Sequence, residues 1–243
     1  MCVLAFAWRP NSRWWLVAAG NRDELHSRPA ASLMRWDEQP RLLAGRDMLS
    51  GGTWMGVSEE GRFAVVTNIR SEAAPDPDLE SRGALVVRLL TEPNLRLEAG
   101  LAARFNAFNM ISADGEDATF FANRPAFQRR SLASGVYGLA NADLDAPWPK
   151  TVRLRSGMED WLADDEAGAA DLLELLAEGR EMPLDPSAEA HLSPVFMRNI
   201  VYGTRCSTVV LIDTKGHGAI VERSYSPEGA VTNETELTFR WPS

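Results

Sequence analysis

The sequence predicts an α+β protein with largely antiparallel sheets. Segments rich in β-branched and aromatic residues group towards both ends of the chain, where short polar turns separate them, and amphipathic segments with leucine at helical spacing occupy the middle. Strands joined by short turns pair antiparallel, so these hairpin clusters indicate antiparallel sheets. The chain shows no internal repeat and no clear linker, and we therefore expect one domain over residues 1–243.

The N-terminal elements bring polar residues close to the start of the chain. We expect a strand at residues 3–8, a turn at the RPNSR segment and a second strand at 14–20. In such a hairpin the end of the second strand lies beside the start of the first. The sequence NRDE at 21–24 follows the second strand, and its composition is as consistent with a solvated turn as with a functional cluster. The hairpin nevertheless predicts that Cys2 and residues 21–23 are neighbours in space.

The remaining elements follow from local pattern. A hairpin is expected within residues 51–70, with its turn at EEG, and the proline-rich stretch at 72–81 is expected to be a loop. Ser81 can cap the helix that follows it. The expected helices cover 82–92, 95–108, 151–163 and 168–178, and the expected later strands cover 109–113, 118–122, 207–213, 219–225 and 235–241.

Composition excludes several classes of function. A chain of 243 residues with 45% hydrophobic content can bury a proper core. Its net charge of -9 and the lack of a basic stripe argue against a nucleic-acid partner. No apolar run approaches the roughly 20 residues of a membrane span, and the N-terminus lacks the pattern of a secretory signal. Two cysteines do not suggest a disulfide scaffold, so we expect a soluble cytoplasmic protein.

Cys2 directly follows the initiator methionine. One interpretation is a small apolar residue in the first strand. The other is that aminopeptidases remove Met1, because residue two is small, and leave a thiol beside a free α-amine, which together are a nucleophile and its base. A charged cluster beside such a thiol can hold the amine and tune the thiolate. On this second interpretation we predict that Met1 is removed.

Three further segments place polar side chains near strand ends. Asn68 and Arg70 close the strand in VVTNIR, and Asn141 follows a short strand in GLANADLDAPWPK. An asparagine at a strand end is usually a turn residue, but its amide is also a neutral donor suited to an oxyanion. Arg205 begins the buried-looking strand of YGTRCSTVVLID, where a guanidinium needs a partner.

The histidines do not indicate a metal or haem centre. His26, His191 and His217 are scattered, no pair of ligands has the short spacing of a zinc site, and no haem-attachment motif occurs. A lone histidine is more often structural or solvated. From the residues alone we therefore predict no metal and no resident cofactor.

Five segments carry a resemblance to a known family. They are Cys2, NRDE at 21–24, GGTWMGV with TNIR, LANADLDAPWPK and YGTRCSTVVLID. Together they resemble the NRDE family, whose eukaryotic members are called transport and Golgi organisation proteins. More distantly, the chain is similar to the N-terminal-nucleophile hydrolases of the penicillin V acylase and bile salt hydrolase branch. This resemblance implies a four-layered αββα sandwich.

The resemblance also implies a site and two kinds of function. The implied catalytic residues are Cys2, Asp23, Asn68, Asn141 and Arg205, and the implied substrate-binding residues are Asn21, Arg22 and Arg70. Either Arg205 or Arg22 would order Cys2 or bind a substrate carboxylate. The first function is hydrolysis of an amide or thioester of a small molecule through Cys2. The second is a carrier without turnover, which holds haem as a cargo, or an acyl-CoA or other lipid, in the same groove.

Overall fold

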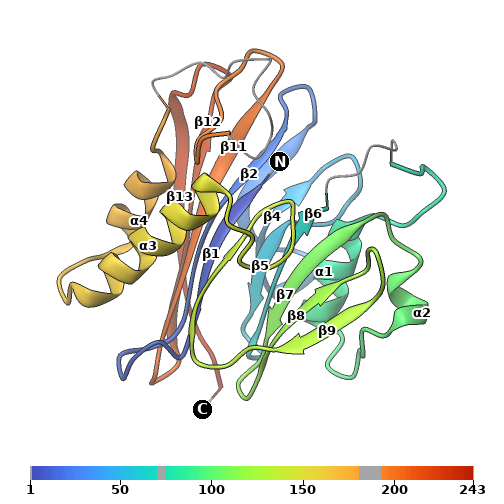
Figure 1. Cartoon of the computed structure of the whole chain (residues 1–243), viewed down its shortest axis with the longest axis horizontal. Helices are drawn as coiled ribbons and strands as arrows, with labels where there is room; N and C mark the ends of the chain where they lie inside the picture. The colour runs from blue at the N-terminus through green and yellow to red at the C-terminus, as the bar shows by residue number, and fades with distance from the viewer. Residues whose placement is uncertain (1, 70–74, 181–192, 243) are drawn as a thin grey trace.

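Two antiparallel sheets lie face to face at the centre of the computed structural model, which describes residues 2–69, 75–180 and 193–242 (Figure 1). The six-stranded sheet has the order β10 (Gly135–Leu139), β1 (Val3–Trp8), β2 (Trp14–Leu25), β11 (Tyr202–Asp213), β12 (His217–Tyr225) and β13 (Val231–Arg240). The seven-stranded sheet has the order β3 (Ala30–Trp36), β4 (Gln39–Asp47), β5 (Met55–Ser58), β6 (Arg62–Asn68), β7 (Phe108–Ala113), β8 (Ala118–Ala122) and β9 (Gln128–Ser131).

Helices cover the outer face of each sheet (Figure 1). The helices are α3 (Pro149–Ala163) and α4 (Ala169–Leu176) on the six-stranded sheet, and α1 (Arg82–Thr91) and α2 (Ala99–Ala102) on the seven-stranded sheet. Leu154 and Leu172 pack on the first sheet, whereas Leu85 packs on the second. The four layers confirm the predicted αββα sandwich. Among the described residues, no helix is long and apolar enough to cross a membrane.

The alternation of side chains along β1 explains why this strand is apolar throughout. Val3 and Ala5 face the helices α3 and α4, whereas Leu4 and Phe6 face the seven-stranded sheet. All six residues of β1 are buried. Phe6 stacks on Phe63 of β6 with 5.6 Å between ring centroids, and burial of each such ring stabilises the fold by about 1.5–3 kcal/mol. β1 is therefore fixed from both sides, and so is the position of Cys2 at its start.

The predicted N-terminal hairpin is confirmed, but the solvated turn at NRDE is wrong. Val3 of β1 pairs with Asn21, so the end of β2 does lie beside the start of β1. However, β2 continues to Leu25, and Asn21, Arg22 and Asp23 are buried. The physical reason is that β1 and β11 pair with the two edges of β2, while the helical layer and the seven-stranded sheet cover its two faces.

The expected helix at 95–108 is also wrong. Only Ala99–Ala102 is helical, because the chain must become extended again for β7, which begins at Phe108. Asn123 ends this short helix, since its Nδ2 donates to the backbone oxygen of Ala102 at 3.0 Å. The helix at α1 is confirmed, although the Ser81 side chain makes no capping hydrogen bond. The sequence reasoning did not find β3, β4 or β9.

Candidate active site

Cys2 directly precedes β1 and faces the space between the two sheets. Val3 packs towards the helices, and the alternation of the strand therefore turns Cys2 towards the seven-stranded sheet. Cys2 lines a small cavity together with Arg22, Trp54 and Thr67. The cavity holds about 10 Å³, close to the space of one water molecule. A substrate would therefore need this cavity to open.

Asn141 connects Cys2 to the end of β6. The backbone nitrogen of Cys2 donates to Asn141 Oδ1 at 3.2 Å, and Asn141 Nδ2 donates to the backbone oxygen of Asn68 at 2.7 Å. Thr67 Oγ1 donates to the backbone oxygen of Ala140 at 2.7 Å. Asn141 is only 4% exposed. The segment after β10 is thus fastened to β6 of the other sheet, and its amide is held against the Cys2 nitrogen.

Asp23 lies on the opposite face of the six-stranded sheet, among buried polar groups of the helical layer. Its Oδ1 accepts a hydrogen bond of 2.7 Å from Thr204 Oγ1 of β11. Burial raises the pKa of Asp23, while Lys150 and Thr204 act in the opposite direction by favouring the carboxylate. A raised pKa brings a carboxyl group closer to the pH range in which it can exchange a proton with other groups.

Lys150 is a buried charged residue that sequence reasoning missed. It lies in the first turn of α3, is 2% exposed, and its Nζ donates to Ser193 Oγ at 2.9 Å. Burial lowers the pKa of Lys150, and the nearby Asp23 and Cys2 partly offset this by favouring the charged form. A signal was present, because LANADLDAPWPK, one of the segments that carry the family resemblance, ends at Lys150.

Arg22 faces the same side of the sheet as Cys2. Its guanidinium carbon lies 4.6 Å from the centroid of the Trp54 ring, and its Nη2 donates to Asp47 Oδ2 at 3.3 Å. Arg28 Nε also donates to Asp47 Oδ2, at 2.7 Å. Burial would raise the pKa of Asp47, but Arg28, the Ser50 amide and Arg22 outweigh it and lower the pKa. Asp47 is therefore a carboxylate that orders two arginines.

Arg205 holds the turn that follows β2. Its Nη1 donates to the backbone oxygens of Leu25, His26 and Arg28 at 2.9, 3.2 and 3.0 Å. The register of β11 against β2 shifts between Thr204 and Cys206, and this irregularity places Arg205 beside that turn. Its contacts are thus structural ones, and its implied role at Cys2 stays a prediction.

The remaining predicted residues differ in what they contact. Asn21 Nδ2 donates to the backbone oxygens of Leu176 and Val195, at 2.8 and 3.0 Å, and its Oδ1 accepts from Ser207 Oγ at 2.6 Å. The side chain of Asn21 is therefore engaged with the helical layer. The side chain of Asn68 is exposed, and its role as an oxyanion donor stays a prediction. Arg70 lies outside the described residues.

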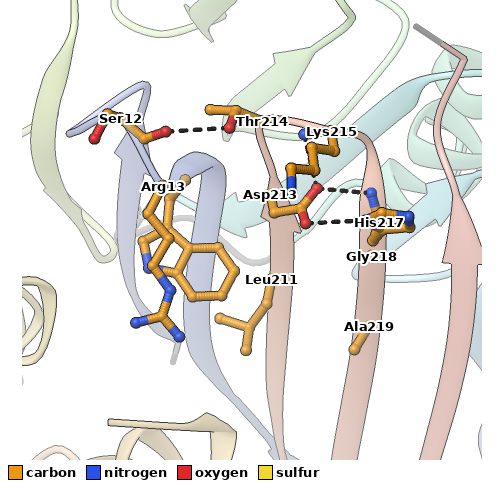
Figure 2. A pocket seen from close by; sticks show the side chains of 10 residues that line it. Ser12, Arg13, Leu211, Asp213, Thr214, Lys215, His217, Gly218 and Ala219 are labelled. Atoms are coloured by element: carbon orange, nitrogen blue, oxygen red, sulfur yellow. Dashed lines mark hydrogen bonds and ion pairs between the residues drawn. The ribbon is translucent and has the colours of Figure 1, made fainter. Parts of the chain in front are cut away.

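A larger hollow lies at the opposite end of the six-stranded sheet (Figure 2). This groove of about 520 Å³ lies between the β1–β2 turn and the β11–β12 turn. Its side chains include Asp213 and His217, where Nδ1 lies 3.0 Å from Asp213 Oδ2, and Arg13, whose Nη1 donates to the backbone oxygen of Asp165 at 2.6 Å. None of the described residues predicted for the site lines the groove.

Related sequences cover almost the whole chain. The family model described as Transport and Golgi organisation 2 matches residues 1–227. The Transport and Golgi organization protein 2 homolog of Bos taurus is 32% identical, over 92% of this chain and 93% of the relative. The Mus musculus homolog is 30% identical over 99% of this chain and 100% of the relative. The Drosophila melanogaster protein is 24% identical over 92% of this chain and 92% of the relative.

Solved structures with a similar fold share little sequence with this chain. Penicillin V acylase from Agrobacterium tumefaciens has a TM-score of 0.52 and 13% identity, covering 92% of this chain and 83% of that chain. The N-acylethanolamine-hydrolyzing acid amidase ortholog of Caenorhabditis elegans has a TM-score of 0.52 and 11% identity. This match covers 86% of this chain and 92% of that chain. A variant of conjugated bile acid hydrolase from Clostridium perfringens has a TM-score of 0.53 and 10% identity. This match covers 100% of this chain and 97% of that chain. These likenesses confirm the predicted fold of the N-terminal-nucleophile hydrolase type.

Proposed function

The chain belongs to the Transport and Golgi organisation 2 family, and from this membership and the geometry around Cys2 we propose that it is a hydrolase with an N-terminal cysteine nucleophile. Its substrate is an amide or thioester of a small molecule. The proposal requires that Met1 is removed, so that Cys2 carries both the thiol and the α-amine.

The contact between the Cys2 nitrogen and Asn141 carries the proposal. With Met1 in place this nitrogen belongs to an amide, and removal of Met1 turns it into an amine with a typical pKa of about 7.7–8.0. Asn141 Oδ1, 3.2 Å away, can accept a hydrogen bond from either form. Two residues 139 positions apart are held together in a buried place, which a surface turn asparagine would not require.

The chemistry proceeds in two steps that balance protons. In the first, the Cys2 amine takes the thiol proton, the thiolate forms a C–S bond with the acyl carbon, and the leaving amine or thiol departs with the proton from the ammonium group. In the second, the amine takes a proton from water, the hydroxide attacks the thioester, and the acid leaves while the Cys2 thiol is restored. A neutral amide such as that of Asn141 stabilises the oxyanion by roughly 3 kcal/mol when well placed.

The buried groups around Asp23 support the amine in this role. Asp23 lies on β2, the neighbour of β1, and the hydroxyl of Thr204 fixes its carboxyl group. Burial lowers the pKa of Lys150, and the nearby Asp23 and Cys2 act in the opposite direction by favouring its charged form. A buried acid and a buried cation beside the chain start would stabilise the charges that appear when the amine takes and returns a proton.

The names of the structural neighbours support hydrolysis over simple binding. They are an acid amidase, an acylase and a bile acid hydrolase. The alternative is the carrier, with haem or an acyl-CoA or other lipid as its cargo in the Cys2 cavity, which would have to open to admit it. The difference between the two functions is whether the thiol is needed, because a carrier depends on the binding space far more than on the nucleophile.

A mass measurement combined with a depletion screen tests the proposal. Untagged protein should lose Met1 in the intact mass, wild type should deplete one or more acyl amides or thioesters from a metabolite mixture, and Cys2→Ala should deplete none. Cys206→Ala is the matched control, because Cys206 is the other cysteine of the chain and is buried. It should retain the wild-type rate.

Three results would contradict the proposal in different ways. Quantitative retention of Met1 would exclude the amine as base. Hydrolysis that survives in Cys2→Ala would exclude Cys2 as the nucleophile. Binding of haem or acyl-CoA that persists in Cys2→Ala, with no hydrolysis by wild type, would favour the carrier.

A further inference from the structure

One buried hydrogen-bond donor of Arg22, near Cys2, has no partner in the described parts of the chain. The side chain is 5% exposed, and its Nη2 lies 3.3 Å from Asp47 and 3.9 Å from Glu24. Its Nη1 is buried and has no hydrogen-bond partner among the residues that the structure describes. A buried guanidinium N–H without an acceptor is unfavourable, so this donor indicates an acceptor supplied by a ligand. Arg22 also lines the cavity that contains Cys2.

Arg82 is a second guanidinium near Cys2, and it comes from the other half of the sandwich. It is the first residue of α1, and its Nη1 donates to the backbone oxygen of Ala107 at 3.0 Å. Burial lowers the pKa of Arg82, while Cys2 and Glu24 favour its charged form, so it lies within electrostatic reach of both. No carboxylate pairs with it in the described parts of the chain.

The first turn of α1 is held close to the Cys2 cavity. The backbone nitrogen of Thr53 donates to the oxygen of Gly83 at 3.2 Å, and Trp54, the next residue, lines the cavity. A side chain at Gly83 would clash with the backbone of Thr53 at 2.9 Å, so only glycine permits this approach. Ser81 does not cap the helix, and the positive end of the helix dipole adds to the charge of Arg82.

Four arginines gather near Cys2, namely Arg22, Arg28, Arg82 and Arg205. Glu24 and Asp47 form ion pairs with Arg22 and Arg28, and the buried carboxyl groups of Asp23 and Glu222 lie within electrostatic reach of Arg22. Arg28 and Arg22 are paired with Asp47, and Arg205 is occupied by backbone oxygens, so the unused capacity lies with Arg82 and with Nη1 of Arg22.

We propose that the substrate of Cys2 carries an anionic group, a carboxylate or a phosphate, which Arg82 and Arg22 bind at the edge of the Cys2 cavity. That the bound anion is part of a substrate rests on the proposed function, whereas anion binding at this site does not require turnover. Guanidinium groups suit such a partner because their N–H donors match the oxygens of carboxylate and phosphate. Neutral acyl amides are therefore expected to be poor substrates.

A pair of thiol reagents that differ in charge tests the anion site. Iodoacetate is an anion and iodoacetamide is neutral. Each alkylates the thiolate sulfur through its CH₂ carbon and releases iodide. The rate of modification at Cys2 is followed by peptide mass spectrometry in wild type, Arg82→Gln, Arg82→Lys and Arg88→Gln. Arg88 is the matched control, since it lies on the same helix but is paired with Glu92 on the surface.

The measured quantity is the ratio of the iodoacetate rate to the iodoacetamide rate. Arg82→Gln should lower this ratio about fivefold. Two opposite unit charges about 4 Å apart in water attract each other by an energy that corresponds to about a fivefold change in rate. Arg82→Lys should keep most of the ratio, and Arg88→Gln should keep all of it. An equal ratio in Arg82→Gln and Arg88→Gln would overturn the proposal.

A competition on the wild-type protein keeps the test independent of whether Arg82→Gln folds. Inorganic phosphate or acetate, compared with chloride at equal ionic strength, should slow iodoacetate more than iodoacetamide, and the stronger competitor identifies the preferred anion. Equal slowing of both reagents by both anions would overturn the proposal. Alkylation needs only the thiol, so failure of the anion site and failure of hydrolysis give different results.

Discussion

The two ends of the six-stranded sheet hold polar side chains in opposite surroundings. At the Cys2 end, Asn21, Asp23, Asn141 and Lys150 are between 2% and 4% exposed. At the other end, the groove of Figure 2 contains His217, whose side chain is 58% exposed, and Asp213, at 29%. The groove holds about 520 Å³, whereas the Cys2 cavity holds about 10 Å³.

The comparison teaches that burial of polar groups locates this site better than the size of a hollow. A buried polar group that loses its partner costs about 1–3 kcal/mol, so such groups persist only where the fold holds them in place. A surface ion pair contributes only about 0–1 kcal/mol, because water and salt screen its charges. The Cys2 end therefore has the fixed polar groups that the proposed chemistry requires, whereas the polar contacts of the groove lie in its turns.

Loss of the Asn141 amide should give the largest effect. Asn141→Leu keeps the approximate volume but removes both the acceptor for the Cys2 nitrogen and the donor to Asn68. Hydrolysis should fall about 100-fold or more, the effect of removing one oxyanion donor. The measurement is kcat/KM on a substrate found by depletion, with Asp213→Asn in the groove as the control at the wild-type value. Equal rates in the two variants would break the comparison.

Removal of the Asn21 amide should give the next largest effect, and on stability. Asn21→Leu leaves the buried oxygens of Leu176 and Val195 without their donor, which should lower the free energy of unfolding by about 3 kcal/mol. The control is Asn11→Ala in the turn beside the groove, where Asn11 accepts from two exposed backbone amides and the loss should be about 1 kcal/mol. Urea unfolding followed by circular dichroism measures both. A smaller loss for Asn21→Leu than for Asn11→Ala would reverse the comparison.

Loss of the contact between Asp213 and His217 in the groove should give the smallest effect on stability, and this effect should depend on pH. Burial alone would raise the pKa of Asp213, but the hydrogen bonds from His217 and Lys215 outweigh it and lower the pKa below its ordinary value of 3.8. The carboxylate therefore contributes stability above about pH 3.8, which is lost as the pH falls through the folded-state pKa. Asp213→Asn should lower unfolding stability by about 1 kcal/mol or less at pH 7, and this loss should become smaller as the pH falls to about 2. A loss at pH 2 as large as at pH 7 would show that the charge plays no part.

Local pattern was sufficient for much of the fold. The hairpin around RPNSR, the EEG turn and the amphipathic helices α3 and α4 follow from short-range spacing, and the structure confirms them. The helix expected at 95–108 failed because β7 and the amide of Asn123 end it after one turn. Propensity alone could not anticipate the contact from Asn123, which lies 21 residues beyond Ala102.

The candidate site shows the same division. Position two of the chain marked Cys2, and hairpin geometry was enough to bring it beside residues 21–23. Which face each residue occupies was not accessible, because it depends on register and on what covers the strand. The structure turns Asn21 and Asp23 towards the helices and Arg22 towards Cys2, and it adds Lys150 and Arg82, which no strand-end pattern marks.

By itself the sequence determined the thiol at position two, the hairpin beside it and the layered α+β class, since these depend on residues close together in the chain. Only the tertiary structure decided that Asn141 reaches the Cys2 nitrogen across 139 residues and that Arg82 approaches from the opposite layer. The physical reason is that packing two sheets face to face removes water from both inner surfaces. The polar groups that remain there must find partners from distant segments, and those partners are set by the packing.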